Sequence, residues 1–271
     1  HVVHPNEVKW ISESSGKTDK IDAKKLAELA RADMLPRKVH IVEGETRELR
    51  EIASARHILQ AKRVALINCI RGFCKQEGIR LPEKFFNRDD WRNALGKSKL
   101  SKNLKMIIEK MVPAIDALLE AEADLTGEMC QFSDERTELL ETIPAIGVIT
   151  SRVIVGAIDD AKRFDSKKSV AKYGALTPRI YQSGNVIHLG RIAANGRHEL
   201  RRVLIQCAHT ITRMKCLEAK PLREFFERVQ KRSGKKKAIV ALARKLLTTA
   251  FGVLKSGRVY DPKMLEGYKT A

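Results

Sequence analysis

Apolar residues recur every three or four positions along most of this chain, which is the spacing of an amphipathic helix. The clearest run is the seam Leu49, Ile52, Arg56, Leu59, Arg63, Leu66, Ile70 and Phe73. Arg56 and Arg63 stand at core positions of this seam, so they suit a partner that is not purely apolar, either a second subunit or nucleic acid. Gly78 and Pro82 end the run, because neither residue continues a helix easily.

A second apolar stripe covers residues 102–140, and a polar loop around residues 89–91 joins the two runs. Pro113 is expected to kink the second helix or to mark its restart, since a proline removes one backbone hydrogen bond from a helix. Two long helices with one polar connection predict an antiparallel coiled-coil arm over residues 43–141. Such an arm either joins subunits or packs as an ordinary helical hairpin on its own domain, and the pattern fits both.

The first part of the chain, residues 1–42, is expected to begin with short extended pieces at residues 2–3 and 8–11. The spacing of its later apolar residues predicts a helix that starts near Thr18 and ends before Pro36. This part of the chain therefore combines extended and helical segments.

Asp19 and Asp22 stand three positions apart in the first turn of that helix and therefore share one face. One interpretation is N-terminal capping, with Thr18 or Asp19 as the cap and both acids favoured by the helix dipole. The other is a pair of metal-binding carboxylates, because hard divalent cations prefer oxygen ligands. The spacing alone fits both interpretations.

Residues 143–158 follow the order apolar, proline, apolar, glycine and apolar helix, which is typical of a helix-hairpin-helix. Gly147 stands in the turn, where the absence of a side chain lets another backbone approach closely. The amides after Gly147 open the next helix and can bind a phosphate. The alternative is a plain turn between two helices.

A short helix is predicted from Ser166 to Tyr173, and residues 179–189 predict a β-hairpin with residues 183–185 at its turn. Ser183 is either a simple turn residue or an exposed nucleophile, which needs activation and a held electrophile. No G-x-S-x-G sequence is present, so a hydrolase triad is not supported.

Residues 195–196 are expected to cap a helix that carries arginines at its start. Arg197 and Arg201 fall on one face of this helix, and Arg202 follows them. Guanidinium groups in such positions suit the oxygens of a phosphate. This region also contains His188 and His198. Each is either a structural histidine or one that acts as a general base or a phosphate ligand.

The C-terminal segment predicts two further helices between residues 221 and 254. It is the most basic part of the chain, and few acids interrupt its lysines and arginines. Lys235, Lys236 and Lys237 are expected to contact phosphates, although a charge run is often only a solvated face. We expect the tail after Gly257 to be loosely held.

The formal charge of +19 indicates that the partner is a polyanion such as nucleic acid, because a strongly basic protein attracts negative charge. Aromatic residues make up only 5% of the chain, so phosphate contacts are expected to outweigh base stacking. The apolar share of 43% argues against disorder. The five cysteines form no CxxC pair, which argues against a zinc site or a disulfide framework. No apolar run is long enough to span a membrane, and we expect no signal peptide in the residues given.

Several motifs occur in a specific order over nearly the whole chain. They are Lys17-Thr18-Asp19-x-x-Asp22-Ala23, Ile143-Pro144-x-Ile146-Gly147, Phe164, Tyr173-Gly174-Ala175-Leu176-x-Pro178, Ser183-Gly184, Asn195-Gly196 and Leu200-Arg201-Arg202. Each motif is weak alone, but the ordered set resembles the transposases of the insertion-sequence family called one-ten, relatives of the Piv-type DNA invertases.

The resemblance implies an N-terminal RuvC-like domain with an Asp-Glu-Asp-Asp site for Mg²⁺ or Mn²⁺, in which Asp19 and Asp22 match the last two acids. It also implies a coiled-coil arm and a C-terminal transposase domain, in which Ser183 matches the nucleophilic serine. Members of this family are recombinases that a bridge RNA directs to donor and target DNA. They act as dimers paired into tetramers, with active sites shared between subunits.

The chain departs from the family's pattern in two places. In the family, the first Asp and the Glu of the metal site precede the motif that contains Asp19, whereas this chain opens at His1 without an initiator methionine. Glu7 and Glu13 lie too close to Asp19 to replace them, so we expect a piece of a longer protein that is inactive alone. Gln182 stands where the family often has a small residue.

We therefore expect a mainly α-helical chain with three parts. These are the C-terminal part of a RuvC-like α/β domain at residues 1–42, the arm at residues 43–141, and a transposase domain with a helix-hairpin-helix and a small β-hairpin at residues 142–271. The expected function is RNA-guided DNA transposition through a phosphoserine intermediate, by a homodimer or homotetramer in the bacterial or archaeal cytoplasm.

Two alternatives stay open. One is a non-catalytic helix-hairpin-helix protein that binds nucleic acid, and the other is a metal-dependent nuclease for branched DNA in which Ser183 is only a turn residue. A covalent protein–DNA adduct separates the recombinase from both alternatives. Metal-dependent cutting without an adduct favours the nuclease.

Overall fold

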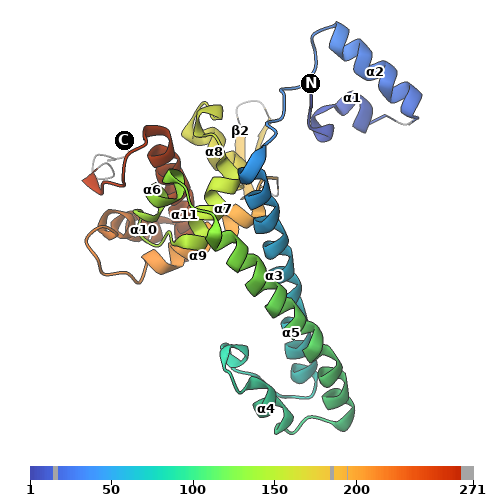
Figure 1. Ribbon diagram of the computed structural model, residues 1–271, viewed down its shortest axis with the longest axis vertical. Helices are drawn as coiled ribbons and strands as arrows, with labels where there is room; N and C mark the ends of the chain where they lie inside the picture. The colour runs from blue at the N-terminus through green and yellow to red at the C-terminus, as the bar shows by residue number, and fades with distance from the viewer. Residues whose placement is uncertain (15–17, 184–185, 194, 264–271) are drawn as a thin grey trace. The chain divides into compact units, whose positions relative to one another are not determined.

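The chain is mainly helical, as the apolar spacing predicts (Figure 1). The residues that the computed structural model describes are 1–14, 18–183, 186–193 and 195–263. They form two compact units, unit 1 at residues 1–43 and unit 2 at residues 44–271. No helix in the described part of the chain combines the length and the apolar character that crossing a membrane requires.

Unit 1 holds a 3₁₀ turn and two helices, η1 (Pro5–Glu7), α1 (Lys9–Ser12) and α2 (Asp19–Arg31). The prediction of α2 is confirmed, and its N-cap is Thr18, whose hydroxyl accepts a hydrogen bond from the Ile21 amide at 3.3 Å. The predicted extended piece at residues 8–11 is wrong. These residues enter α1, and the Lys25 ammonium of α2 donates to the Trp10 carbonyl there at 3.2 Å. The described residues of unit 1 contain no strand, so the expected α/β remnant is not confirmed.

Unit 2 begins with two long helices, α3 (Gly44–Gln76) and α5 (Lys102–Gln131), which lie side by side and antiparallel (Figure 1). We call residues 44–131 the arm. The two long helices that the apolar seams predict are present, although the second ends at Gln131 rather than near residue 140. Pro113 lies inside a continuous α5, so the predicted restart of the helix does not occur.

The two seam arginines contact an acidic residue of the same chain. Glu122 of α5 is 8% exposed, with one carboxylate oxygen 3.5 Å from the Arg56 guanidinium and the other 2.9 Å from that of Arg63. Arg56 also donates to the hydroxyl of Thr126 at 2.7 Å. A second subunit or nucleic acid is therefore not needed to explain these arginines, because α5 supplies the opposite charge.

Replacing Glu122 with glutamine is expected to lower the free energy of unfolding by about 3–5 kcal/mol, because two largely buried guanidiniums lose the negative charge between them. Urea unfolding followed by circular dichroism measures this loss. Glu120→Gln is the matched control, since it removes an exposed carboxylate from the same helix and should cost less than about 0.5 kcal/mol. Equal losses in the two variants would contradict a buried role for Glu122.

Part of the segment between the two arm helices packs on them. It contains η2 (Phe85–Asn87) and α4 (Trp91–Gly96). Trp91 is 5% exposed, and its ring centroid lies 5.0 Å from that of Phe86. Ile70 and Ile115 of the arm helices belong to the same apolar cluster. The predicted polar loop is correct for Asp89 and Asp90, which are exposed in a turn, and wrong for Trp91, which starts α4 and is buried.

The rest of unit 2, which we call the body, packs around two buried helices, α7 and α11. Its elements are α6 (Glu135–Glu141), α7 (Val148–Ile158), η3 (Ala161–Arg163), α8 (Lys167–Tyr173), β1 (Pro178–Ser183), β2 (Val186–Ile192), α9 (His198–Ile211), α10 (Lys220–Ser233) and α11 (Lys235–Ser256). α7 is buried continuously from Ser151 to Ile158, and α11 buries one apolar face. The helices predicted at residues 166–173 and between residues 221 and 254 are thus confirmed as α8, α10 and α11.

The chain after α11 returns to the body. Gly257 has a left-handed φ of +63°, which turns the chain there. The Tyr260 amide then donates to the Thr142 hydroxyl at 3.0 Å, and the Tyr260 hydroxyl donates to the Glu218 carbonyl at 3.1 Å. Burial raises the pKa of Tyr260 to about 12. The tail is therefore held as far as Tyr260, which corrects the expectation of a loose tail there, and residues 264–271 lie outside the described residues.

Candidate functional site

The predicted β-hairpin is present, with β1 and β2 as an antiparallel pair. Ser183 is the last residue of β1 and is paired with Val186, so it borders the turn of the hairpin. Residues 184–185 of that turn lie outside the described residues. The backbone of Ser183 thus lies where the sequence predicts it, and its role as a nucleophile stays a prediction.

Both ends of the hairpin are fixed close to the turn that follows α8. The Ala193 amide, just after β2, donates to the carbonyl of Thr177, just before β1, at 2.9 Å. The Arg201 guanidinium of α9 donates to the carbonyls of Ala193 and Ala175 at 3.2 and 3.5 Å. The chain therefore enters and leaves the hairpin through one hydrogen-bonded base.

Gly196 lets the start of α9 pack closely against the turn that follows α8, at the end of the hairpin that is bound to the body. Its φ of +123° suits glycine, and a Cβ there would lie 2.7 Å from the Tyr173 carbonyl oxygen and 2.9 Å from the Ala175 amide nitrogen. The Arg197 amide donates to the same Tyr173 carbonyl at 2.9 Å. Arg197 is the N-cap residue of α9, and its side chain makes no capping hydrogen bond. The predicted cap at residues 195–196 is therefore wrong, and Gly196 serves close packing instead.

Two of the predicted phosphate-binding arginines have partners inside the body. Arg197 donates to the Tyr173 hydroxyl at 3.2 Å and pairs with Glu199 at 3.1 Å. Burial opposes the charge, but Tyr173 and Glu199 raise the pKa of Arg197 above its ordinary value. Arg201 donates to Nδ1 of His198 at 2.8 Å, in addition to the carbonyls at the hairpin base. These contacts give both arginines a supporting role, and their contact with phosphate stays a prediction.

The third arginine and the candidate bases have different surroundings. Arg202 is half-buried near His57 of α3, and burial, followed by the charge of Arg202, lowers the pKa of His57. His188 is exposed on β2, where it is paired with Tyr181. His198 is the first residue of α9 and accepts the hydrogen bond from its neighbouring arginine. A role of either candidate as a base stays a prediction.

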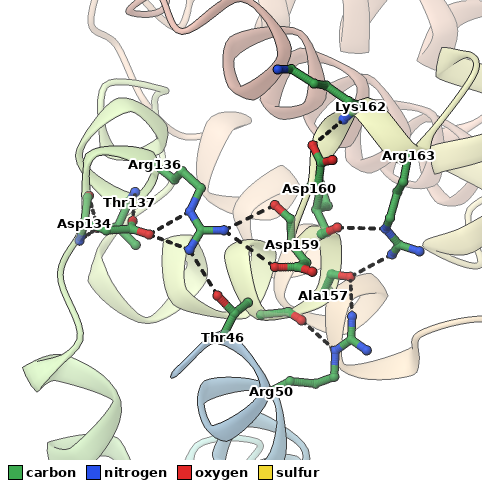
Figure 2. A network of polar contacts seen from close by, with 12 residues as sticks. Thr46, Arg50, Asp134, Arg136, Thr137, Ala157, Asp159, Asp160, Lys162 and Arg163 are labelled. Carbon is green, nitrogen blue, oxygen red and sulfur yellow. Dashed lines mark hydrogen bonds and ion pairs between the residues drawn. The ribbon is translucent and has the colours of Figure 1, made fainter. Parts of the chain in front are cut away.

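Guanidinium groups hold the C-terminal end of α7 (Figure 2). Arg50 of α3 donates to the carbonyls of Gly156 and Ala157 at 2.7 and 3.0 Å. Arg163 of η3 donates to the carbonyls of Ile158 and Ala157 at 2.9 and 3.2 Å. The last carbonyls of a helix carry its negative end, so these positive side chains stabilise α7.

Tyr173 links this end of α7 to the hairpin base. Its hydroxyl donates to the Ala157 carbonyl at 3.0 Å and accepts the hydrogen bond from Arg197. Arg50 reaches the same hydroxyl at 3.5 Å, and the Arg163 guanidinium lies 4.7 Å from the centroid of the tyrosine ring. The arm, α7 and the start of α9 therefore meet at one side chain.

Arg136 of α6 also fixes the start of the arm to the body (Figure 2). Arg136 of α6 pairs with Asp134 at 2.6 Å and with Asp159 at 3.8 Å, and it donates to the Thr46 hydroxyl of α3 at 3.1 Å. Asp159 follows α7 with a φ of +56°, which is costly for a residue other than glycine. The ion pair with Arg136 helps to offset that cost.

Sequence reasoning assigned no role to Arg50, Arg136 or Arg163, because their contacts join distant parts of the chain. Arg50 and Tyr173, for example, are 123 residues apart. One local signal exists, which is Gly156 inside the apolar run of α7. A Cβ at this glycine would lie 3.2 Å from the backbone nitrogen of Arg50, so the glycine marks where α3 packs closely on α7.

Gly147 is the N-cap residue of α7, and no side chain caps this end of the helix in the described structure. The left-handed residue of the preceding turn is Ala145, with a φ of +67°, whereas Gly147 has a φ of −104°. A Cβ at Gly147 would meet no described atom within 4 Å. The fold itself therefore leaves room beside the first amides of α7, and phosphate binding there stays a prediction.

Asp19 and Asp22 lie in the first turn of α2, as predicted. Thr18 caps this helix and both acids lie in its first turn, so the capping interpretation is confirmed with Thr18 as the cap. One carboxylate oxygen of Asp22 is buried without a hydrogen-bond partner in the described structure, which fits an oxygen that binds a cation. Asp19 is exposed. The described residues contain no group of three acids, histidines or cysteines that could hold a metal, and a metal-binding role of Asp19 and Asp22 stays a prediction.

Lys235, Lys236 and Lys237 form the first turn of α11, and all three are exposed. Positive charge is unfavourable at this position, because the N-terminal end of a helix is the positive end of its dipole. A bound phosphate would offset that cost. Contact between these lysines and nucleic acid stays a prediction.

Two family models match separate parts of the chain. A model described as "Transposase IS116/IS110/IS902 family" matches residues 137–224. A second, described as "Transposase" and named for the DEDD transposases of IS110, matches residues 1–77.

Individual relatives agree with these matches. The chain is 36% identical over 135 residues to the pilin gene-inverting protein of Moraxella bovis, a match that covers 49% of this chain and 41% of that relative. It is 25% identical over 252 residues to the transposase for insertion sequence element IS1328 of Yersinia enterocolitica, covering 91% and 74%. It is 26% identical over 268 residues to the transposase for insertion sequence element IS1111A of Coxiella burnetii, covering 96% and 72%. The chain thus spans about two fifths of the length of the pilin gene-inverting proteins that it matches.

Proposed function

Because the chain belongs to the IS110 family of transposases, we propose that it is part of an enzyme that cuts and rejoins DNA through Ser183. The observation that carries this proposal is the support of the serine hairpin. Ser183 ends β1, and the hydrogen bonds from Ala193 and Arg201 hold both ends of the hairpin on the body. These contacts attach to the body the two strands whose turn Ser183 borders. The formal charge of +19 suits a DNA substrate.

In the proposed reaction, the hydroxyl oxygen of Ser183 attacks a phosphorus atom of the DNA backbone. A phosphodiester forms between the serine and one strand end, the original phosphorus–oxygen bond breaks, and the other strand end takes up a proton as a free hydroxyl. The number of phosphate ester bonds stays the same. The hydroxyl of a different strand can therefore reverse the step and join a new pair of ends without ATP.

An unassisted serine hydroxyl is a weak nucleophile, so the reaction needs a base or a cation. Asp19 and Asp22 fit two ligands of a Mg²⁺ or Mn²⁺ site, and the buried unpartnered oxygen of Asp22 supports this assignment. When bound, the ion would supply Lewis-acid activation of an oxygen at the reacting phosphate. The first turn of α2 keeps both carboxylates on one face of the helix.

The proposed partners are donor DNA, target DNA, a guide RNA and further copies of the chain. The family resemblance implies this assembly, in which the acids of one subunit serve the serine of another. The exposed lysines at the start of α11 and the uncapped amides at the start of α7 offer sites for phosphates. Gly147, Arg197, Arg201 and Arg202 stay candidates for contact with the nucleic-acid backbone.

The test is a covalent adduct. The complete protein is incubated with its RNA, labelled donor and target DNA, and Mg²⁺, and the products are separated on a denaturing gel. We expect a protein–DNA adduct whose digestion and mass spectrometry place the modification on Ser183. A DNA-bound complex that neither cuts DNA nor forms an adduct would leave the non-catalytic binding protein as the better account.

A metal-dependent nuclease is the second candidate, because the buried oxygen of Asp22 favours a metal site whether or not Ser183 reacts. In that case Ser183 is a turn residue, and water attacks the phosphorus. The same gel separates the two candidates, since the nuclease produces cut DNA that carries no protein.

Replacing Lys235, Lys236 and Lys237 together with alanine is expected to make DNA binding less sensitive to salt. Each phosphate contact releases counterions, so losing three contacts lowers the slope of log affinity against log salt by up to about 2.7 for duplex DNA. Fluorescence anisotropy over a salt series measures the slope. A control in which Lys99, Lys102 and Lys110 become alanine changes the charge equally at exposed positions of the arm. Equal changes in slope would show that α11 has no special role.

A further inference from the structure

An exposed aromatic residue lies two positions before Ser183 on β1. Tyr181 is 57% exposed, and its neighbour Ile180 is 64% exposed. A two-stranded hairpin is only marginally stable. Large apolar side chains that stay exposed to water do not stabilise it, because their exposed part packs against no other group. Ile180 and Tyr181 are successive residues of one strand, so each side of the hairpin presents an exposed apolar side chain.

The hairpin holds the ring of Tyr181 in place. The ring lies across the strand pair against Gly190 of β2, where a Cβ would come within 3.1 Å of its Cε2 atom. Glycine at this position leaves the space that the ring occupies, as in other sheets where an aromatic side chain covers a cross-strand glycine. The hairpin therefore supports one side of the ring while most of the residue remains exposed.

The sequence on both sides of this ring is basic. Residues 166–198 contain six lysines and arginines and no aspartate or glutamate. Arg179 and Arg191 stand on the two strands of the hairpin itself. Like charges oppose the docking of a second copy of the same hairpin. Cations beside an exposed ring instead fit nucleic acid, because the cations contact phosphates and the ring stacks on a base.

We propose that Tyr181 stacks on a nucleobase of the DNA strand that Ser183 cuts, one or two steps from the cut phosphate. This inference rests on the proposed function. Two residues advance a β-strand by about 7 Å, and successive nucleotides of a DNA strand lie about 3.4 Å apart, which sets the number of steps. Stacking fixes the base and thereby the phosphate beside it, so Tyr181 is a positioning residue for the reaction at Ser183.

A double-mutant cycle between protein and DNA tests this contact. The complete protein with Ser183→Ala is assembled with its RNA, and its affinity is measured by anisotropy for DNA with one abasic nucleotide at successive positions around the cut. We expect one position at which loss of the base weakens binding by about 5- to 150-fold. With Tyr181→Ala added, the same abasic nucleotide should have no further effect. Tyr181→Phe should keep the coupling, and Tyr181→Leu, which has no ring, should lose it.

Each other outcome has a definite meaning. Binding without coupling at any position overturns the stacking contact, and so does coupling that survives in Tyr181→Leu. A change in oligomer mass in Tyr181→Ala, with no coupling to DNA, would assign the ring to a second copy of the chain and overturn the proposal. Because the assay uses Ser183→Ala, it does not depend on serine chemistry. Coupling in this assay combined with no adduct in the wild-type protein would reject the phosphoserine reaction alone.

Discussion

Replacing Ser183 with alanine is expected to remove the covalent protein–DNA adduct, a loss of at least about a thousandfold in its rate of formation. The reason is chemical, since alanine has no oxygen to attack phosphorus. Ser183 ends β1 next to the hairpin turn, and Arg201 and the Ala193 amide hold the opposite end of the hairpin. Binding of DNA and the oligomeric state should therefore stay unchanged. Denaturing gels of the complete complex measure the adduct, and anisotropy measures DNA binding.

Two further variants sharpen this test. Ser183→Cys is expected to retain a trace of adduct, because a thiolate also attacks phosphorus. Ser256→Ala is the matched control, since its hydroxyl donates to the Val253 carbonyl at the end of α11, and this variant should form the adduct normally. An adduct that survives in Ser183→Ala would place the nucleophile elsewhere.

Replacing Asp22 with asparagine is expected to reduce DNA cleavage by the complete complex at least about a hundredfold, since even changes outside the ligand shell of a metal cost about 10- to 100-fold. The amide keeps the shape of the side chain but removes its charge. The oxygen of Asp22 that is buried without a partner indicates that the carboxylate contributes little to the stability of unit 1. The melting temperature should therefore stay unchanged or rise, while cleavage in Mg²⁺ falls.

Asp33→Asn is the matched control for that variant. Asp33 is an exposed acid of the same unit with a left-handed φ of +53°, a conformation that asparagine tolerates well. This variant should cleave DNA at the normal rate. Equal cleavage by Asp22→Asn and the wild-type protein would remove the metal assignment. In residues 1–271 alone, two carboxylates are expected to bind Mg²⁺ weakly or not at all.

The helices and the hairpin could be predicted because their signals are local. Thr18 and Ser166 cap the helices that follow them, and in each case the hydroxyl accepts a backbone hydrogen bond within three residues. The prediction failed at residues 8–11 and at Trp91, where partners distant in sequence decide the structure. Trp91 looked like part of a polar loop because its neighbours are charged, and only the arm shows what buries it.

The candidate site was only partly predictable. The order of the motifs predicted roles for Ser183, Asp19 and Asp22 that stay predictions, while the structure places the serine at the end of β1 and both acids in one helical turn. The sequence did not predict which groups accept the hydrogen bonds of the arginine side chains. Arg197 and Arg201 share a helix face in the sequence, but Tyr173, Glu199 and the carbonyls of the hairpin base accept their hydrogen bonds.

The sequence by itself determined the approximate positions of the longer helices and of the hairpin, because periodicity and capping act between near neighbours, and its composition set the strong positive charge. Tertiary structure alone decided that Glu122 neutralises the seam arginines and that Tyr173 joins the arm to the base of the serine hairpin. It also placed the ring of Tyr181 over Gly190. The role of a buried charge or an exposed ring depends on the groups that the fold brings close to it. These groups are distant in sequence, so the spacing of residues along the chain does not predict them.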